Sequence, residues 1–367
     1  TNLDVVDIDG AVDMASTLTL AGNADFNGNL DVDGTTDLDG LTVAGNLSVD
    51  GGTIKLDGNY PTGTNNVALG DIALADGSLS GGNNTAIGRS SLYSNTSGAN
   101  NTGIGSGALE NNTTAASNTA VGYHSLLANT TGAGNVAVGA LALDANTTAA
   151  NNTAVGLEGL SANTTGAGNT SVGSLALNNN TTAANNTAVG YLALTTNTTA
   201  SNNTAIGKSA LQANTTGTEN VAIGASALDA NTTGQYNTVV GTAAFSTDTK
   251  GSRAVAVGYG ALNTQNFTSA TNNYNVAIGH AAGNNVSTGQ QNTFIGGLAG
   301  QLNTTGAENT AVGQSALNAN TTADNNTAIG KSALAANTTG ELNTAVGVST
   351  LDANTTGARN TALGEFA

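Results

Sequence analysis

Residues 118–134 read NTAVGYHSLLANTTGAG, and residues 135–151, which follow directly, read NVAVGALALDANTTAAN. Both segments have 17 residues and share the small and aliphatic residues before a glycine, a leucine four residues after it, and ANTT. With that glycine as reference, the pattern occurs eighteen times between Gly70 and Gly364, and fifteen of the seventeen spacings are 17 residues. A disordered low-complexity chain has no reason to keep such a register, so the period predicts a folded repeat protein.

The residues just before each reference glycine favour a short β-strand. The position three residues before it is always Thr or Val, and the position one residue before it is always Val, Ile or Leu. A small residue, usually Ala, lies between them, so one face is β-branched or aliphatic and the other is small. The reference glycine then ends the strand where the chain bends. We expect the Ala face to allow close approach of another chain.

The rest of each unit carries turn residues and one large aliphatic side chain. Asn lies four residues before the reference glycine in all units except that of Ala254, and it predicts a turn because Asn tolerates left-handed backbone angles. Leu126 and its equivalents are predicted to point inward from a second short strand or turn. Thirteen N-T-T or N-T-S tripeptides match the N-glycosylation pattern, but their constant phase favours a ladder of turns.

Together these features predict an all-β fold, a β-solenoid of eighteen 17-residue coils over residues 67–367. At about 4.8 Å per coil, the rod would be roughly 85 Å long. Two large aliphatic side chains contribute about 3–6 kcal/mol per coil, whereas ordering each residue costs about 1–2 kcal/mol. We expect further burial in a homotrimer, with the Ala faces at the subunit interface.

The first 59 residues follow a different rule. They contain eleven Asp and one Lys, and Gly28, Gly34 and Gly40 lie six residues apart. We expect a separate Gly/Asp-rich β-rod over residues 1–59, joined to the solenoid by a linker at residues 60–66. The D-x-D-G sequences in the rod are interpreted as solvated turns, because the full spacing of a known calcium loop is absent.

Composition argues against several classes of protein. The formal net charge of −17 disfavours binding to nucleic acid or to anionic lipid. No apolar run is long enough to span a membrane, and there is no cysteine for disulfides or thiolate metal sites. The chain begins at Thr1 without a leader, from which we expect an internal or processed segment of a longer protein.

The repeat units carry a resemblance to a known group of proteins. The NTAVG…AL…NTTG pattern over residues 64–367 resembles the head repeats of trimeric autotransporter adhesins, and more closely the repeats of long phage tail fibres. The resemblance implies a homotrimeric β-roll or triple β-helix with a role in host attachment. It implies a place on the virion tail, other tail or fibre proteins at the N-terminus, and a glycan or protein of the host surface as partner. The head of a bacterial trimeric adhesin, on a cell surface, is the alternative.

We expect no catalysis, cofactor or metal. His124 and His280 lie nine units apart, and no pair of carboxylates recurs at one phase of the repeat. An ice-binding solenoid with a flat threonine array is a second alternative. Against it, adjacent threonines of N-T-T should point to opposite sides, and the other threonine column is freely replaced by valine.

Recognition is expected where the repeat breaks. The spacing from Gly258 to Gly279 is 21 residues, and the next two units replace the inward leucine by glycine, at Gly283 and Gly300. Exposed aromatic residues are candidates for stacking on sugars or host protein in a chain with only 3% aromatics. The predicted receptor-binding residues are Gln265, Asn266, Phe267 and Tyr274.

Overall fold

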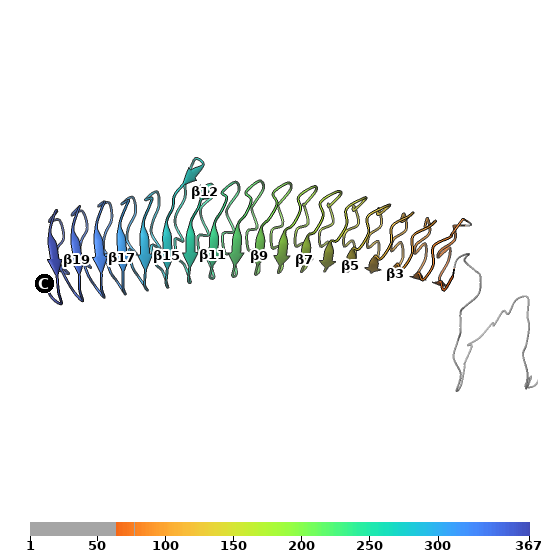
Figure 1. Ribbon diagram of the computed structural model, residues 1–367, viewed down its shortest axis with the longest axis horizontal. Helices are drawn as coiled ribbons and strands as arrows, with labels where there is room; N and C mark the ends of the chain where they lie inside the picture. The colour runs from red at the N-terminus through yellow and green to blue at the C-terminus, as the bar shows by residue number, and fades with distance from the viewer. Residues whose placement is uncertain (1–63, 77) are drawn as a thin grey trace, which may run out of the picture. The chain divides into compact units, whose positions relative to one another are not determined.

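The computed structural model describes residues 64–76 and 78–367. The chain divides after Lys55 into two units, and all described residues belong to the second. The predicted rod at residues 1–59, its aspartate turns and most of the linker at residues 60–66 lie outside the described residues. In the described part, the chain winds into coils stacked one after another along a single axis, with no helix (Figure 1). Accordingly, no helix there could cross a membrane.

Each coil contributes one strand of three residues to a single parallel sheet of eighteen strands. These strands are β1 (Val67–Leu69), β2 (Thr85–Ile87), β3 (Thr102–Ile104), β4 (Thr119–Val121), β5 (Val136–Val138), β6 (Thr153–Val155), β7 (Thr170–Val172), β8 (Thr187–Val189), β9 (Thr204–Ile206), β10 (Val221–Ile223), β11 (Thr238–Val240), β13 (Val255–Val257), β15 (Val276–Ile278), β16 (Thr293–Ile295), β17 (Thr310–Val312), β18 (Thr327–Ile329), β19 (Thr344–Val346) and β20 (Thr361–Leu363). The parallel solenoid with a 17-residue repeat is therefore confirmed.

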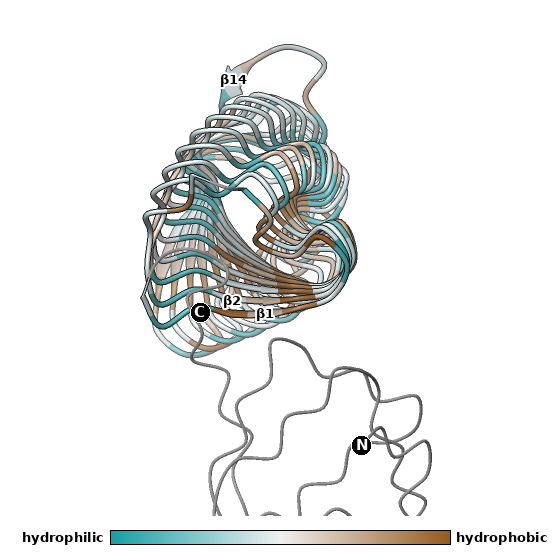
Figure 2. Ribbon diagram, turned by 90° about the vertical axis from the view of Figure 1, so that its right-hand side faces the viewer, coloured by the Kyte–Doolittle hydropathy of each residue, from teal (hydrophilic) through white to brown (hydrophobic). Residues whose placement is uncertain are grey.

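Every strand pairs with the strands of the neighbouring coils at equivalent positions. In β4 and β5, for example, Ala120 lies opposite Ala137. Even across the 21-residue unit, Ala256 of β13 lies opposite Ala277 of β15. The extra residues leave the stack beside β14 (Thr271–Asn272), which pairs with β12 (Gly251–Ser252) of the preceding coil in a separate two-stranded sheet. Figure 2 shows the coils in register and β14 outside them.

The reference glycines lie directly above one another, and this explains why no other residue occurs there. A Cβ atom added to Gly122, whose φ is 137°, would lie 2.5 Å from the carbonyl oxygen of Gly139 in the next coil. The backbones of neighbouring coils thus approach more closely at this corner than any side chain would permit.

The remaining turns differ from the prediction. The asparagine four residues before the reference glycine does not take the left-handed conformation; the residue before it does, as in Ser117 (φ 61°) and Asn151 (φ 60°). No second strand forms around the inward leucine. The chain turns there with His124 (φ 53°) and Leu126 (φ 51°) both left-handed. Each such residue costs about 1–2 kcal/mol, and burying the leucine contributes about 1.5–3 kcal/mol, so burial offsets the strain of its own turn.

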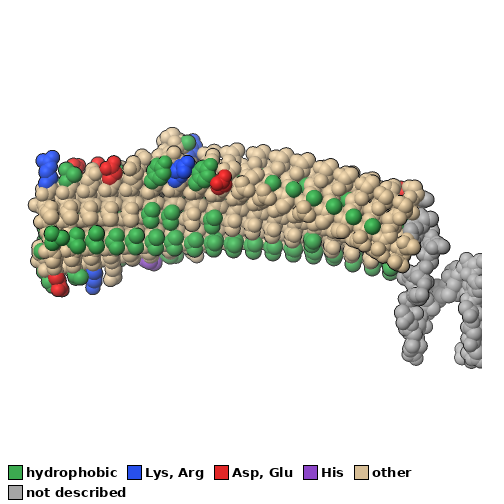
Figure 3. Space-filling view, viewed as in Figure 1, with side chains coloured by type: hydrophobic (Ala, Val, Ile, Leu, Met, Phe, Trp, Pro, Cys, Tyr) green, Lys and Arg blue, Asp and Glu red, His purple; other side chains and the backbone are tan. Residues whose placement is uncertain are grey.

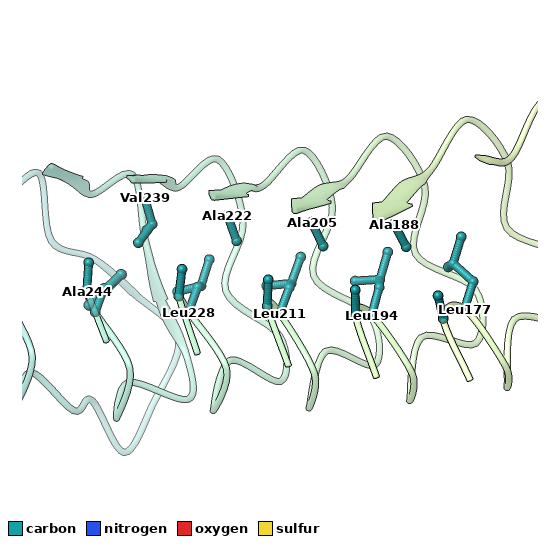
Figure 4. Packing of buried hydrophobic residues seen from close by; sticks show 14 of the residues in the cluster. Leu177, Ala188, Leu194, Ala205, Leu211, Ala222, Leu228, Val239 and Ala244 are labelled. Atoms are coloured by element: carbon teal, nitrogen blue, oxygen red, sulfur yellow. The ribbon is translucent and has the colours of Figure 1, made fainter. Parts of the chain in front are cut away.

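The core of the solenoid is built from small strand residues facing leucines. Figure 4 shows Ala188, Ala205 and Ala222 of successive strands opposite Leu194 and Leu211. All of these side chains are fully buried within the single chain. The inward leucine is confirmed, but the expected Ala face at a subunit interface is wrong. The interior of the coil is narrow, so the strand residue opposite the leucine is usually alanine, although Val239 of β11 is also fully buried there.

The other face of the strand sheet points outward. The aliphatic residue just before the reference glycine stays partly exposed along the rod, at 37% for Val172, 38% for Ile206 and 37% for Ile223. In Figure 3, hydrophobic side chains form a row along the lower side of the rod, where Figure 1 draws the strands. We call this the aliphatic row.

Two columns of buried asparagines connect the coils. In the first, the backbone N–H of Asn135 donates to Oδ1 of Asn118 at 2.8 Å, and Nδ2 of Asn118 donates to the carbonyl of Gly132 at 2.9 Å. The second consists of the N-T-T asparagines, where Nδ2 of Asn129 donates to Oδ1 of Asn112 at 2.9 Å. Because Asn129 is fully buried and its amide is bonded, the ladder interpretation of N-T-T is confirmed.

Several side chains five residues after the reference glycine donate a hydrogen bond to a backbone carbonyl of an earlier coil. Here Nδ2 of Asn178 donates to the carbonyl of Glu158 at 3.1 Å, and Nδ2 of Asn263 donates to that of Ala243 at 2.8 Å. Asp144 and Asp229 hold the same position, and one oxygen of each carboxylate is buried without a partner. Burial raises the pKa of both groups above the ordinary value of 3.8. A raised folded-state pKa means that stability falls as the pH rises through it.

We therefore expect Asp144→Asn to stabilise the protein at pH 7 by about 1 kcal/mol, because the amide supplies the missing donor. Below pH 3.8 the folded carboxyl is protonated and the advantage should disappear. Thermal melts at pH 7 and pH 3.5 measure this. Asp352 occupies the same position in an exposed coil, so Asp352→Asn is the control and should leave the melting temperature unchanged. An equal gain in both variants would contradict the explanation.

A second irregularity concerns the size of core residues. Phe294 replaces the strand alanine in β16 and is fully buried. A Cβ atom on Gly283 would lie 2.8 Å from its ring, and one on Gly300 would lie 2.5 Å from it. The two glycines therefore make room for Phe294, and they are a packing compensation rather than a sign of recognition.

This compensation predicts that two substitutions, each destabilising alone, restore stability when they are combined. Phe294→Ala should lower stability by about 3–5 kcal/mol by leaving a cavity, and Gly300→Leu should lower it by collision with the ring. The combination Phe294→Ala with Gly300→Leu restores the alanine–leucine pair of the other coils and should recover most of the loss. Denaturant unfolding measures all three; additive losses would show that the two positions do not share space.

Candidate functional site

The repeat insertion, residues 259–278, is the main departure from the regular rod among the described residues. The N-T-T column changes beside it: Asp248, Gln265 and Val286 replace asparagine in three consecutive coils. Nε2 of Gln265 donates to Oδ2 of Asp248 at 3.3 Å, and Oε1 of Gln265 accepts from Nδ2 of Asn275 at 2.9 Å. Gln265 is fully buried, so it anchors the insertion and does not face solvent.

Asp248 makes its hydrogen bonds in this column as an acceptor, through its carboxylate. Its Oδ1 accepts the backbone N–H groups of Lys250 at 2.8 Å and Gly251 at 2.7 Å, which bends the chain toward β12. Burial raises the pKa of Asp248, and these hydrogen bonds act in the opposite direction.

The four predicted receptor-binding residues separate into two pairs. Gln265 and Phe267 lie inside, Phe267 with only 5% of its surface exposed, so the expectation of an exposed aromatic at Phe267 is wrong. Nothing in the repeat pattern predicted that this ring would be buried. Asn266 and Tyr274 are exposed, with Tyr274 at 53%. For these two, receptor contact stays a prediction.

Tyr274 does not stand alone on the surface. Five residues before the reference glycine, three consecutive coils carry Tyr236, Arg253 and Tyr274. The three residues are exposed, and the left-handed backbone at this corner, with φ between 51° and 65°, turns each side chain outward. The guanidinium of Arg253 lies 4.8 Å from the centre of the Tyr236 ring, a cation–π contact. We call this set the Tyr–Arg–Tyr row.

The insertion holds the row in place. Nε of Arg253 donates to Oδ1 of Asn272 in β14 at 3.2 Å, and Nζ of Lys250 donates to the carbonyl of Thr268 at 3.1 Å. Two of the seven basic residues of the chain thus lie at one insertion. Sequence reasoning missed Tyr236 and Arg253, although their common phase with Tyr274 in three successive units was a visible signal.

The remaining candidates are dispersed. His124 stacks on Tyr123 with ring centres 3.8 Å apart, and His280 stacks on Tyr259 at 5.5 Å, in distant coils. Among residues 64–76 and 78–367, no three acidic or histidine side chains form a group that could hold a metal. The threonines of N-T-T behave differently from each other: Oγ1 of Thr130 donates to the carbonyl of Thr147 at 3.1 Å, whereas Thr131 is exposed.

Comparison with known proteins adds no relative to this picture. No protein-family model matches the chain, and no curated protein or solved structure is detectably similar to it.

Proposed function

We propose that this chain forms the shaft of a homotrimeric, non-catalytic attachment fibre outside the cell, of the kind that phage tails carry. The observation that carries the proposal is the aliphatic row on the outer face of the strand sheet. A row of partly exposed Val, Ile and Leu side chains that continues over many coils is unusual for a surface that meets only water.

The regular spacing of the row favours a second copy of the chain as its partner. Side chains that recur at every coil can be matched along their full length only by a surface with the same spacing. Residues 159–207 contain no charged side chain, so identical chains would not repel each other there. The choice of three chains around one axis, rather than two, rests on the resemblance of the repeat to trimeric fibres. The head of a bacterial trimeric adhesin is the alternative that shares this arrangement.

The absolute mass of the purified chain, measured by light scattering, tests the assembly. We expect three times the 35.5 kDa of one chain. Val172→Lys combined with Ile206→Lys places charges in the aliphatic row and should release folded monomers, because a buried unpaired charge costs several kcal/mol.

The matched control is Thr165→Lys combined with Thr199→Lys, at exposed positions outside the row in the same two coils as Val172 and Ile206. It should keep the trimeric mass. A wild-type chain that is a folded monomer would contradict the fibre proposal. It would instead favour the exposed threonine column as an ice-binding surface, measurable as thermal hysteresis.

A further inference from the structure

The Tyr–Arg–Tyr row has the geometry of a binding surface for a chain-like ligand. Its three residues occupy one phase of three successive coils, so at about 4.8 Å per coil the row extends over about 10 Å along the rod. That length is comparable to two linked sugar rings. The two tyrosines are about half exposed, at 45% for Tyr236 and 53% for Tyr274.

The centre of the row is positively charged. Arg253 uses Nε for Asn272, and among the described residues its two Nη groups bind no carboxylate and make no hydrogen bond. A guanidinium held over an aromatic ring keeps its two Nη groups as a planar fork of donors, which suits an anionic group with two oxygens. This cation stands out in a chain whose net charge is −17.

The surroundings of the row are mainly polar, with two charged neighbours: Glu219, exposed one coil before Tyr236, and Lys250, whose ammonium group bonds to the insertion. The insertion exposes Asn266, Thr268, Ser269 and Asn272, which offer amides and hydroxyls. Sugar rings combine an apolar face, which stacks on tyrosine, with hydroxyl groups, which bind to such side chains. A peptide would need pockets for its side chains, and the described residues enclose no cavity.

We propose that the Tyr–Arg–Tyr row binds an anionic sugar chain, with Arg253 on the carboxylate or sulfate and Tyr236 and Tyr274 against the neighbouring rings. The biological use of this site rests on the attachment function proposed above, but binding itself does not. In Figure 3 the row lies along the upper side, beside the projecting insertion, whereas the aliphatic row follows the lower side. Assembly through the aliphatic row therefore leaves the sugar site open.

The test is calorimetric titration of the full chain with polygalacturonate, dextran sulfate, unsubstituted dextran and polyglutamate. We expect binding to at least one of the two anionic polysaccharides and none to dextran. The polysaccharide that binds more tightly shows whether the site prefers a carboxylate or a sulfate. Arg253→Gln should weaken binding about tenfold or more, because charge-assisted hydrogen bonds are lost. Arg253→Lys should keep only part of the wild-type affinity, since a lysine cannot offer two parallel N–H groups to the anion. Tyr274→Ala should weaken binding as well.

Tyr191→Ala is the matched control, since Tyr191 is 49% exposed in a regular coil and should not affect binding. Circular dichroism and light scattering of every variant separate this proposal from the fibre proposal, because neither fold nor mass should change. The sugar site would be refuted by equal binding of polyglutamate, by unchanged affinity in Arg253→Gln, or by no binding to either anionic polysaccharide.

Discussion

Hydrogen bonding between coils through buried asparagines is the constraint on which the rest of the structure depends. Each asparagine of the two columns, such as Asn118 and Asn129, bonds to its own coil and to the next coil. A buried amide without partners costs about 1–3 kcal/mol, so each coil must bring its asparagines to the same place. The 17-residue period brings successive amides to equivalent places, and the 18-residue unit before Gly88 still keeps the bond from the backbone N–H of Asn84 to Oδ1 of Asn66.

This constraint determines how the rod accommodates irregular units. The four additional residues between Gly258 and Gly279 do not enter the stack; they leave it near β14, which pairs with β12 of the preceding coil, while β13 and β15 still pair in register. Where asparagine is missing, at Asp248 and Gln265, the substitutes bond to each other, whereas Val286 in the next coil fills the same position with a buried apolar side chain. Where a large side chain enters the narrow core, at Phe294, neighbouring leucines are replaced by glycines.

Side chains in the columns that point outward need not bond to the next coil, so the residue type can vary there. The position five residues before the reference glycine holds Asn, Ser, Gly, Glu, Gln, Leu, Tyr or Arg in different coils, with the same left-handed backbone throughout. A solenoid therefore offers a fixed frame on which a few substitutions in successive coils create a binding surface. The Tyr–Arg–Tyr row uses this freedom beside the insertion, and the aliphatic row uses the outward face of the strands.

The sequence by itself determined the solenoid, its period, its strands and the inward leucines, because each of these follows from alternation and spacing along the chain. It could not determine which strand face lies inside. Ala and the β-branched residues alternate in either case, and only the width of the closed coil decides that methyl groups face the leucines. Nor could it show that Phe267 is covered while Tyr236, Arg253 and Tyr274 are adjacent. Those contacts join residues 17 or more positions apart, and stacking of the coils alone brings them together.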